Sequence, residues 1–364
     1  MEKRTSAIII PALDPGRELI EYVDSLIAAG FDRIILVDDG SDAEHRKIFD
    51  ELAVHNECSV LRHAVNLGKG RGLKNAFNYF LNMSDVSDYY GVVTADSDGQ
   101  HTVQDVIRIS DRLKEDSEKG TAALLLGSRD FDLSHVPFKS RWGNRLTRGV
   151  FHLLHGVKLM DTQTGLRGVP TSLIPDFIEL FGERFEYETN MLIAAARSET
   201  GIVELSIETV YENNNEGTHF NPVRDSWAIY KLLFGTFFKY IMASLSSFII
   251  DILMFQLALS LLKKFAIDAG SVITIPVATA IARVISSIYN YLINRNVVFA
   301  SKSNGLSSLI KYYILAAVQL GCSAALVTVF YNWIGIPEVF VKTVVDCVLF
   351  LVSFQIQKRL IFNK

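Results

Sequence analysis

The last third of the chain contains four apolar stretches, each close to the length that crosses a lipid bilayer. A transmembrane helix needs about 20 apolar residues, because each residue adds only ~1.5 Å along the helix axis. One such stretch would also suit a buried helix of a soluble core. Four in succession, joined by short polar loops, predict an all-α membrane domain with four transmembrane helices. The expected spans are about 240–262, 269–293, 309–334 and 339–356.

Lysine and arginine residues near the span ends predict the orientation of this domain. They precede the first span, lie between the second and third spans and follow the fourth, whereas the loop between the third and fourth spans has none. Because cytoplasmic loops carry the excess of Lys and Arg, both termini and the N-terminal part are expected in the cytoplasm. Only Lys263 and Lys264 oppose this orientation. The sequence therefore predicts a multi-pass protein of the cell (cytoplasmic) membrane.

The charge of the chain is divided between two parts. Residues 236–364 hold 11 Lys/Arg and 4 Asp/Glu, whereas residues 1–235 hold 25 and 36, so a basic tail follows an acidic head. An acidic head argues against nucleic-acid binding, which needs a basic face. Three distant cysteines without CxxC spacing fit a reducing compartment and argue against a zinc site. The N-terminal segment is typical of a first strand rather than a signal peptide.

The first 222 residues are predicted to form a Rossmann-like α/β domain with a mostly parallel sheet. Apolar runs such as "SAIIIPAL" and "RIILVDDGS" alternate with helix-like segments such as 18–29 and 69–83. This alternation indicates a parallel sheet covered on both faces, whose ligands bind beyond the carboxyl ends of the strands. Residues 223–238, with their aromatic side chains and lysines, are expected to form an interfacial helix or linker. Residues 239–364 would then form the membrane domain.

Two aspartates one residue apart, Asp96 and Asp98, end the apolar run "GVVTADSDGQ". In an extended chain this spacing puts both carboxylates on the same side. With the amide oxygen of Gln100 they offer the hard oxygen ligands that Mg²⁺ or Mn²⁺ prefers, and such an ion would hold a diphosphate. The alternative is a solvated turn, because DxDG is common in loops. The segment lacks the ligand spacing and closing Glu of an EF-hand.

Two earlier segments would contribute to a ligand site at the same edge of the sheet. Asp38 and Asp39 end another strand and would accept hydrogen bonds from a base and a ribose, although capping of the next helix also explains this sequence. The glycine-rich "NLGKGRGLK" has neither P-loop nor dinucleotide-turn spacing. Its backbone N–H groups, at the start of a helix, would nevertheless suit a phosphate.

Arginines and a polar loop follow further along the head. Arg129 ends the strand-like "TAALLLGSR", and a helix in the next segment would place Arg141, Arg145 and Arg148 on one face. These cations would either clamp a phosphate or form a solvated basic face. The segment "MDTQTGLRG" (160–168) is polar and bounded by glycine, and we expect it to be a binding loop.

Taken in order, these motifs resemble the GT-A glycosyltransferases of the dolichyl-phosphate mannose synthase type, and more narrowly the bacterial polyprenyl-phosphate glycosyltransferases. The resemblance covers roughly residues 5–230, and the combination is far more specific than any single motif. The membrane part is similar to the GtrA-like family of four-helix proteins. The matching segments are "IIIPALD", "VDDGS", "NLGKGRG", "ADSDGQH", "GSR", "DTQTGLRG" and "NNNEGTHFNPVRDS" in the head, and "NYLINRNVVF" and "KRLIF" in the tail.

The resemblance implies a membrane-bound inverting enzyme that transfers a single hexose from a UDP- or GDP-linked sugar to polyprenyl (undecaprenyl) phosphate at the cytoplasmic face. It implies that Asp96, Asp98 and Gln100 hold Mg²⁺ or Mn²⁺ and the diphosphate. It also implies that Arg129 and Arg141 bind the phosphate of the acceptor lipid. The further substrate-binding positions that it implies are Pro11, Ala12, Asp14, Asp38, Asp39, Lys69, Arg145, Asp161 and His219.

The implied nucleophile is the lipid phosphate itself. A phosphate monoester has a second pKa near ~6, so it is largely ionised at neutral pH and needs no strong general base. We therefore assign no Ser–His–Asp triad, and His101 and His219 are expected to be structural or positioning residues. An α-linked donor would give a β-linked product by inversion. Phe138 stands where processive synthases of related fold carry the Gln of Q-x-x-R-W, which argues against a polymerising enzyme.

The charged residues Asp251, Arg283, Lys342 and Asp346 fall inside the expected spans, and each is unfavourable in lipid unless it is paired or hydrated. Asp251 and Asp346 would flank and compensate Arg283, which favours a structural role over a polar path for the head group of a lipid-linked sugar. A lipid-linked-sugar flippase or scaffold with a nucleotide-sugar-binding head is the alternative function. A transferase that acts on the hydroxyl of diacylglycerol or ceramide is a second rival. The sugar, the base and the oligomeric state stay open, and a homo-oligomer formed through the spans is compatible with the sequence.

Overall fold

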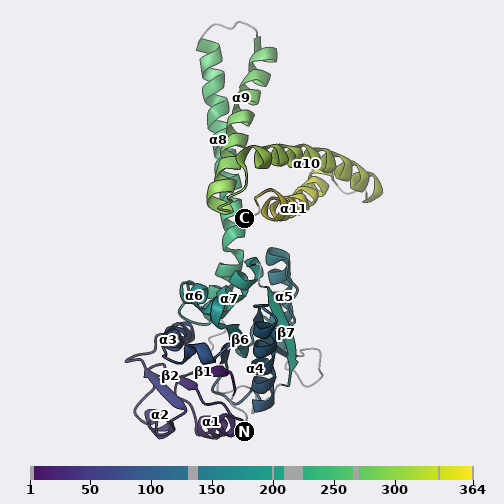
Figure 1. Cartoon of the computed structure of the whole chain (residues 1–364). Helices are drawn as coiled ribbons and strands as arrows, with labels where there is room; N and C mark the ends of the chain where they lie inside the picture. The colour runs from purple at the N-terminus through teal and green to yellow at the C-terminus, as the bar shows by residue number, and fades with distance from the viewer. Residues whose placement is uncertain are drawn as a thin grey trace. The chain divides into compact units, whose positions relative to one another are not determined.

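The computed structural model describes residues 4–129, 138–198, 201–208, 224–264, 270–334 and 337–362. The chain divides into two compact units, residues 1–233 and 234–364, which we call the head and the membrane unit. Figure 1 draws the head in purple to teal and the membrane unit in green to yellow.

The head is built on a seven-stranded, mostly parallel sheet (Figure 1). The order is β3-β2-β1-β4-β6-β5-β7, and among the described strands only β6 runs antiparallel to its neighbours. The predicted parallel sheet is therefore confirmed. The strands are β1 (Ser6–Ala12), β2 (Ile34–Asp38), β3 (Cys58–Arg62), β4 (Gly91–Thr94), β5 (Leu124–Arg129), β6 (Arg167–Pro170) and β7 (Ile202–Ile207).

Helices cover both faces of this sheet, which explains the unbroken apolar sequence of β1 and β2. Ile8, Ile10 and Leu36 join one buried cluster with the apolar sides of α1, α2 and α4. α3 packs on the opposite face, where Gly72 lies beside Val37. The helices of the head are α1 (Glu18–Ala28), α2 (Arg46–Leu52), α3 (Lys69–Leu81), α4 (Val103–Glu118), α5 (Phe138–His155), α6 (Ile174–Ile178) and α7 (Glu186–Arg197).

The antiparallel strand β6 was not predicted from the sequence, because its four residues include Gly168 and Pro170, which are rare inside strands. Its direction matters for the site. Since β6 runs against β4, with Thr94 paired to Arg167, its first residue lies at the edge where β4 ends. The polar loop before β6 is thereby brought to the carboxyl ends of the parallel strands.

Four described helices, α8 to α11, make up the C-terminal part of the chain, and α8 includes the predicted linker from Arg224 onward. Three of the described helical segments are long and apolar enough to cross a membrane: Ile229–Lys264, Gly305–Trp333 and Val339–Ile361. α9 coincides with the second expected span but is not among these three, and its polar residues include Arg283 and Asn290. The helices are α8 (Arg224–Lys264), α9 (Gly270–Ile293), α10 (Gly305–Ile334) and α11 (Glu338–Ile356).

Asp251, Arg283, Lys342 and Asp346, which were singled out inside the expected spans, form two separate pairs. The guanidinium of Arg283 lies 3.6 Å from Asp251, which also accepts a hydrogen bond from the hydroxyl of Ser286. Asp346 pairs instead with Lys342, at 2.9 Å between Nζ and Oδ2. The expectation that Asp346 would help to compensate Arg283 is therefore wrong. Lys342 and Asp346 are four residues apart on one helix, and that spacing makes them neighbours.

Candidate active site

The carboxyl ends of β1, β2, β4 and β5 lie at the same end of the sheet, together with the start of β6. We call this end the carboxyl edge of the sheet. Pairing of Ala12 with Asp38 and of Thr94 with Arg167 sets this edge. Most of the residues singled out in the sequence follow these strand ends, as expected for a parallel sheet.

Asp96, two residues after the end of β4, is held by side chains on two sides. The ammonium of Lys69 lies 2.6 Å from its Oδ1 atom, and Nε2 of His101 lies 3.3 Å from its Oδ2 atom. Gly165 covers the same carboxylate, and a Cβ atom on Gly165 would lie 2.3 Å from Oδ2. The hydroxyl of Thr94 donates to the Gly165 carbonyl at 2.8 Å, which holds the loop in this place.

Lys69 lies between two carboxylates, because its ammonium is also 3.0 Å from Oε2 of Glu188 on α7. The glycines on each side of it make this contact possible. A Cβ atom on Gly68 would lie 2.4 Å from the Glu183 carbonyl oxygen, and one on Gly70 would lie 2.5 Å from Cβ of Tyr187. The glycine-rich motif therefore lets α3 approach α7 closely. Glu188 was not predicted, since nothing in its local sequence separates it from an ordinary helical residue.

The charges around Asp96 shift the pKa values of three groups. Burial alone would raise the pKa of Asp96, but the positive charge of Lys69 and the hydrogen bond from His101 lower it. Burial would lower the pKa of Lys69, yet Asp96 and Glu188 raise it. The pKa of Asp98 is raised by its burial and by the charge of Asp96. Asp96 is therefore ionised, and a further positive charge near Asp98 would favour its ionised form.

The donor set at this edge fits a divalent cation. Asp96 and Asp98 supply carboxylate oxygens, which are the hard ligands that Mg²⁺ and Mn²⁺ prefer. The backbone N–H of Gln100 donates to Oδ1 of Asp98 at 3.2 Å, so the turn after β4 keeps these residues close together. Among the described residues, Asp98 has no ion pair with Lys, Arg or His, unlike Asp96. These residues follow the end of β4 together, and their role as metal ligands stays a prediction.

The second pair of carboxylates, Asp38 and Asp39, follows β2 and is buried. Oδ1 of Asp39 accepts hydrogen bonds from Nδ1 of His63 at 2.7 Å and from the backbone N–H of Leu67 at 2.9 Å. Its Oδ2 atom accepts from the N–H of Gly68 at 2.8 Å. Asp39 therefore holds the loop that leads into α3. In Asp38, the buried Oδ2 atom has no hydrogen-bond partner among the described residues, and Nε of Arg46 lies 3.8 Å from it in a long ion pair.

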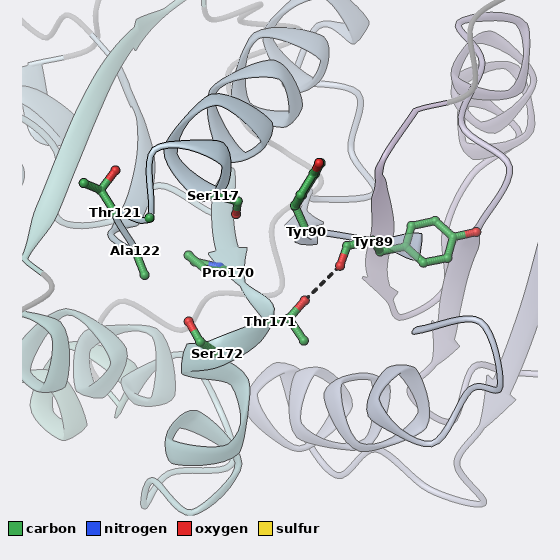
Figure 2. A pocket seen from close by; sticks show the side chains of 9 residues that line it. Tyr89, Tyr90, Ser117, Thr121, Ala122, Pro170, Thr171 and Ser172 are labelled. Atoms are coloured by element: carbon green, nitrogen blue, oxygen red, sulfur yellow. Dashed lines mark hydrogen bonds between the residues drawn. The ribbon is translucent and has the colours of Figure 1, made fainter. Parts of the chain in front are cut away.

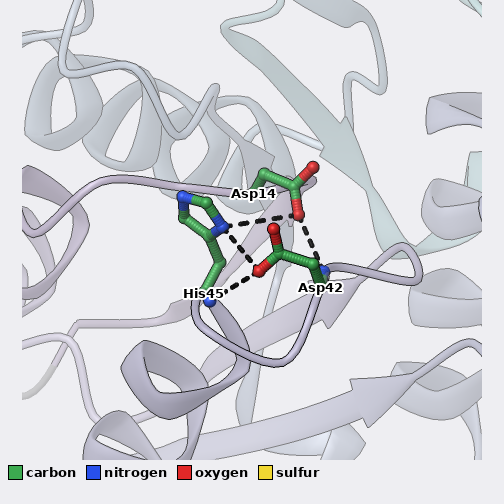
Figure 3. A group of neighbouring side chains, drawn as sticks. All are labelled: Asp14, Asp42 and His45. Atoms are coloured by element: carbon green, nitrogen blue, oxygen red, sulfur yellow. Dashed lines mark hydrogen bonds and ion pairs between the residues drawn. The ribbon is translucent and has the colours of Figure 1, made fainter.

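A third group of polar side chains lies at this edge (Figure 3). Asp14, Asp42 and His45 offer ligand atoms within 4.8 Å of one another, and all three are at least partly exposed. Hydrogen bonds account for their closeness, since Asp42 N–H donates to Asp14 at 2.9 Å and Asp42 lies 2.8 Å from the ring of His45. The cluster joins the loops after β1 and β2. Asp14, a predicted substrate-binding residue, is thus placed at the edge through its own loop contacts.

Arg129 and Asp161, predicted separately from the sequence, form an ion pair. Nε of Arg129 lies 2.6 Å from Oδ2 of the fully buried Asp161. Glu204 on β7 holds the Asp161 loop by accepting the N–H of Met160 at 2.8 Å, and Asn144 on α5 donates to the Met160 carbonyl at 3.0 Å. Sequence reasoning missed both anchors, because they lie on elements distant in the chain.

The other predicted residues have different surroundings. Pro11 and Ala12 are buried at the end of β1, and Arg145 is exposed on α5. Arg148, expected on the same face as Arg145, donates instead to the Leu159 carbonyl at 2.8 Å. The side chain of Arg141 and the whole of His219 lie outside the described residues.

A cavity of about 350 Å³ lies at the opposite edge of the sheet (Figure 2). Its lining comes from the residues before β4 and β5 and from the residues after β6, including Tyr90, Thr121 and Ser172. Thr171 donates from its hydroxyl to the Tyr89 carbonyl at 3.2 Å across one side of the cavity. None of the predicted site residues lines it, so this cavity is separate from the candidate active site.

The fold and the site together define a class: an α/β enzyme domain with an acidic carboxyl edge, followed by apolar helices. Comparison with known families agrees with it. Residues 7–146 match glycosyl transferase family 2, and residues 239–362 match the GtrA/DPMS transmembrane domain.

Individual proteins similar to this chain come from several organisms. The UDP-N-acetylglucosamine–dolichyl-phosphate N-acetylglucosaminyltransferase of Methanococcus voltae is 28% identical over 247 residues, which are 62% of this chain and 94% of that protein. An uncharacterised protein of Methanocaldococcus jannaschii is 26% identical over 239 residues, which are 64% of this chain and 92% of that protein. The crystal structure of mannosyl-3-phosphoglycerate synthase from Rubrobacter xylanophilus aligns with 62% of this chain and 70% of its own, with 14% identity and a TM-score of 0.44.

The chain therefore joins a family 2 glycosyltransferase domain of the GT-A type to a C-terminal GtrA/DPMS transmembrane domain. It is a membrane protein and a sugar-transferring enzyme. The resemblance drawn from the sequence and the predicted enzyme class are both confirmed.

Proposed function

We propose that this enzyme transfers a single hexose-type sugar from a nucleotide-diphosphate donor to polyprenyl phosphate at the cytoplasmic face of the membrane. The observation that carries the proposal is the grouping of carboxylates and an arginine at the carboxyl ends of β4 and β5. Asp96 and Asp98 lie at the end of β4, and the Arg129–Asp161 pair lies where β5 ends. One edge thus offers carboxylates for a metal-bound diphosphate and an arginine for a second phosphate.

The donor side rests on the surroundings of Asp96. Mg²⁺ or Mn²⁺, held by Asp96, Asp98 and Gln100, would supply positive charge that stabilises the departing nucleoside diphosphate. Lys69 keeps Asp96 ionised, because its ammonium is 2.6 Å away. The buried Oδ2 atom of Asp38 is suited to accept a hydrogen bond from the nucleoside.

The acceptor side rests on the buried pair of Arg129 and Asp161. Asp161 fixes the guanidinium through Nε at 2.6 Å, so that the rest of the planar group is held in one orientation. An arginine positioned in this way suits a phosphate. An oxygen of the lipid phosphate would attack the anomeric carbon, and the bond from that carbon to the diphosphate would break, with the electron pair leaving on the nucleoside diphosphate. This displacement inverts the anomeric centre.

The name of the Methanococcus relative supports a lipid phosphate as the acceptor and makes UDP-N-acetylglucosamine the first donor to test. The membrane unit supports an acceptor drawn from the bilayer. We propose that α9 also crosses the membrane, which gives four spans, since it is a helix of 24 residues whose Arg283 pairs with Asp251 of α8. Both termini would then lie in the cytoplasm, with the head and its donor.

The test uses purified full-length protein with Mn²⁺, polyprenyl phosphate and a panel of UDP- and GDP-linked sugars. We expect release of nucleoside diphosphate with one class of donor. Mass spectrometry of the lipid product should show one sugar added to the lipid phosphate, and NMR should show inversion. No release with any donor would instead favour a flippase or scaffold. A sugar found on diacylglycerol or ceramide would favour a hydroxyl acceptor.

A further inference from the structure

Lys69 and Glu188 form a pair that neither the family match nor the proposed chemistry explains. The ammonium lies 2.6 Å from Asp96 and 3.0 Å from Glu188, and the side chain of Glu188 is only 9% exposed. Oε1 of Glu188 is buried and has no hydrogen-bond partner among the described residues, and its nearest printed cation is Nε of Arg167 at 3.9 Å. Glu188 therefore has an oxygen that makes only a long ion pair, next to a cation that it shares with a candidate metal ligand.

The backbone around Lys69 is built to hold it in this position. Asp39 accepts the N–H groups of Leu67 and Gly68, and the N–H of Arg71 donates to the Glu183 carbonyl at 2.9 Å. Lys69 is the first residue of α3, where the helix dipole disfavours a positive charge. The two carboxylates therefore keep the ammonium here against that effect.

We propose that Lys69 neutralises Asp96 while the metal site is empty and that its ammonium moves away from Asp96 when the metal and the donor bind. Glu188 is then the positioning residue whose carboxylate binds this ammonium. The inference rests on the proposed metal site. A dication at Asp96 and Asp98 repels an ammonium 2.6 Å from the same carboxylate. The Oε1 atom of Glu188, which makes only a 3.9 Å ion pair with Arg167, gives the ammonium a second acceptor. From there Lys69 balances the negative charge of the diphosphate while Asp96 binds the metal.

A purely structural ion pair is the alternative, and α3 provides a matched control for it. The ammonium of Lys74 lies 3.0 Å from Glu183 and donates to the Leu180 carbonyl at 3.1 Å. Lys74 is buried to a similar degree as Lys69, but neither of these partners is a candidate metal ligand. Loss of Lys74 thus reports the structural effect of removing a lysine from this helix.

The decisive measurement is Mn²⁺ affinity of the donor-free, full-length protein by isothermal titration calorimetry. Lys69→Met should bind Mn²⁺ about tenfold more tightly, because a competing positive charge is removed from Asp96. Glu188→Gln should bind it several-fold more weakly (on the order of threefold), because Lys69 loses its second acceptor and stays on Asp96. Lys74→Met should match the wild type. Both Lys69→Met and Glu188→Gln should lower turnover.

These opposite changes separate the proposal from a structural role, which would weaken metal binding in both variants. Unchanged or weaker binding in Lys69→Met would overturn the inference while leaving the proposed function intact. Absence of Mn²⁺ binding to the wild type would overturn both. If Lys69→Met does not fold, Lys69→Gln takes its place. Glu188→Gln tests the direction of the change in Mn²⁺ affinity independently. Tighter binding in Glu188→Gln would contradict the proposal.

Discussion

Two strand ends of this sheet carry the same kind of sequence but hold their carboxylates in different ways. β2 ends at Asp38 and Asp39, and β4 is followed by Asp96 and Asp98. Asp39 is held by two backbone N–H groups and a buried histidine. Asp96 is held by the side chains of Lys69 and His101.

The two carboxylates differ in whether the groups that bind them can move away. Backbone N–H groups of a packed loop cannot move away from a buried carboxylate without unfolding that loop, so we expect the main role of Asp39 to be structural. A side chain such as Lys69 can change its rotamer and give up its place to a stronger cation. Carboxylates held by side chains are therefore the ones available for metal binding.

Asp96→Asn should lower turnover by about 10³-fold, because the metal loses a charged ligand and the diphosphate loses its counter-charge. The initial rate of nucleoside diphosphate release measures this effect. The thermal midpoint should change little, since the residue is held by exchangeable side chains. Turnover within a few-fold of the wild type (about threefold) would show that Asp96 is not a metal ligand.

Asp39→Ala should lower the stability of the head. The change leaves the N–H groups of Leu67 and Gly68 without their acceptor, and the loss should be about 3 kcal/mol in the free energy of unfolding. Thermal unfolding of the purified protein, followed by circular dichroism, checks this value. A variant of normal stability that no longer binds nucleotide would instead make Asp39 a ligand residue, and the contrast between the two strand ends would disappear.

Asp161→Asn should raise the KM for the lipid phosphate by about tenfold, because Arg129 is no longer fixed by a charged partner. The KM for the donor should stay close to that of the wild type. Steady-state kinetics with each substrate varied in turn separates the two constants. An equal rise in both would show that this pair does not belong to the acceptor side.

Gly165→Ala should weaken Mn²⁺ binding by a few-fold (about threefold), since the new Cβ atom would lie 2.3 Å from Oδ2 of Asp96 and displace the carboxylate. Gly149→Ala on α5 is the matched control, because nothing lies within 4 Å of a Cβ atom there. Calorimetry of both variants makes the comparison. Equal affinities in the two would show that the loop yields without disturbing the metal site.

Much of the head was predictable because its strands are buried on both faces. Such strands appear as unbroken apolar runs, and the polar residues at their ends lie together by the geometry of a parallel sheet. β6 was missed because it is short and contains glycine and proline. Glu188 was missed because its partners come from α3 and the end of β4, and a single sequence does not show which distant residues meet.

The difference between the two acidic strand ends could not be predicted from the sequence either. Asp39 and Asp96 differ in their partners, and the N–H groups that hold Asp39 lie 28 and 29 residues further along the chain. The membrane unit was easier to predict as a helical region than as a set of spans. Three of the described helical segments have the length and hydropathy of a span, and α9 as a further span is a proposal.

The central claim is that the carboxylates after β4 hold a divalent cation that carries the diphosphate of the donor. The most direct test is the affinity of the purified protein for UDP, and for GDP, measured by calorimetry with Mn²⁺ and again with EDTA. We predict that the nucleotide of the true donor binds at least about tenfold more tightly with Mn²⁺, and that Asp98→Ala abolishes this gain. Equal affinity in Mn²⁺ and EDTA would contradict the account.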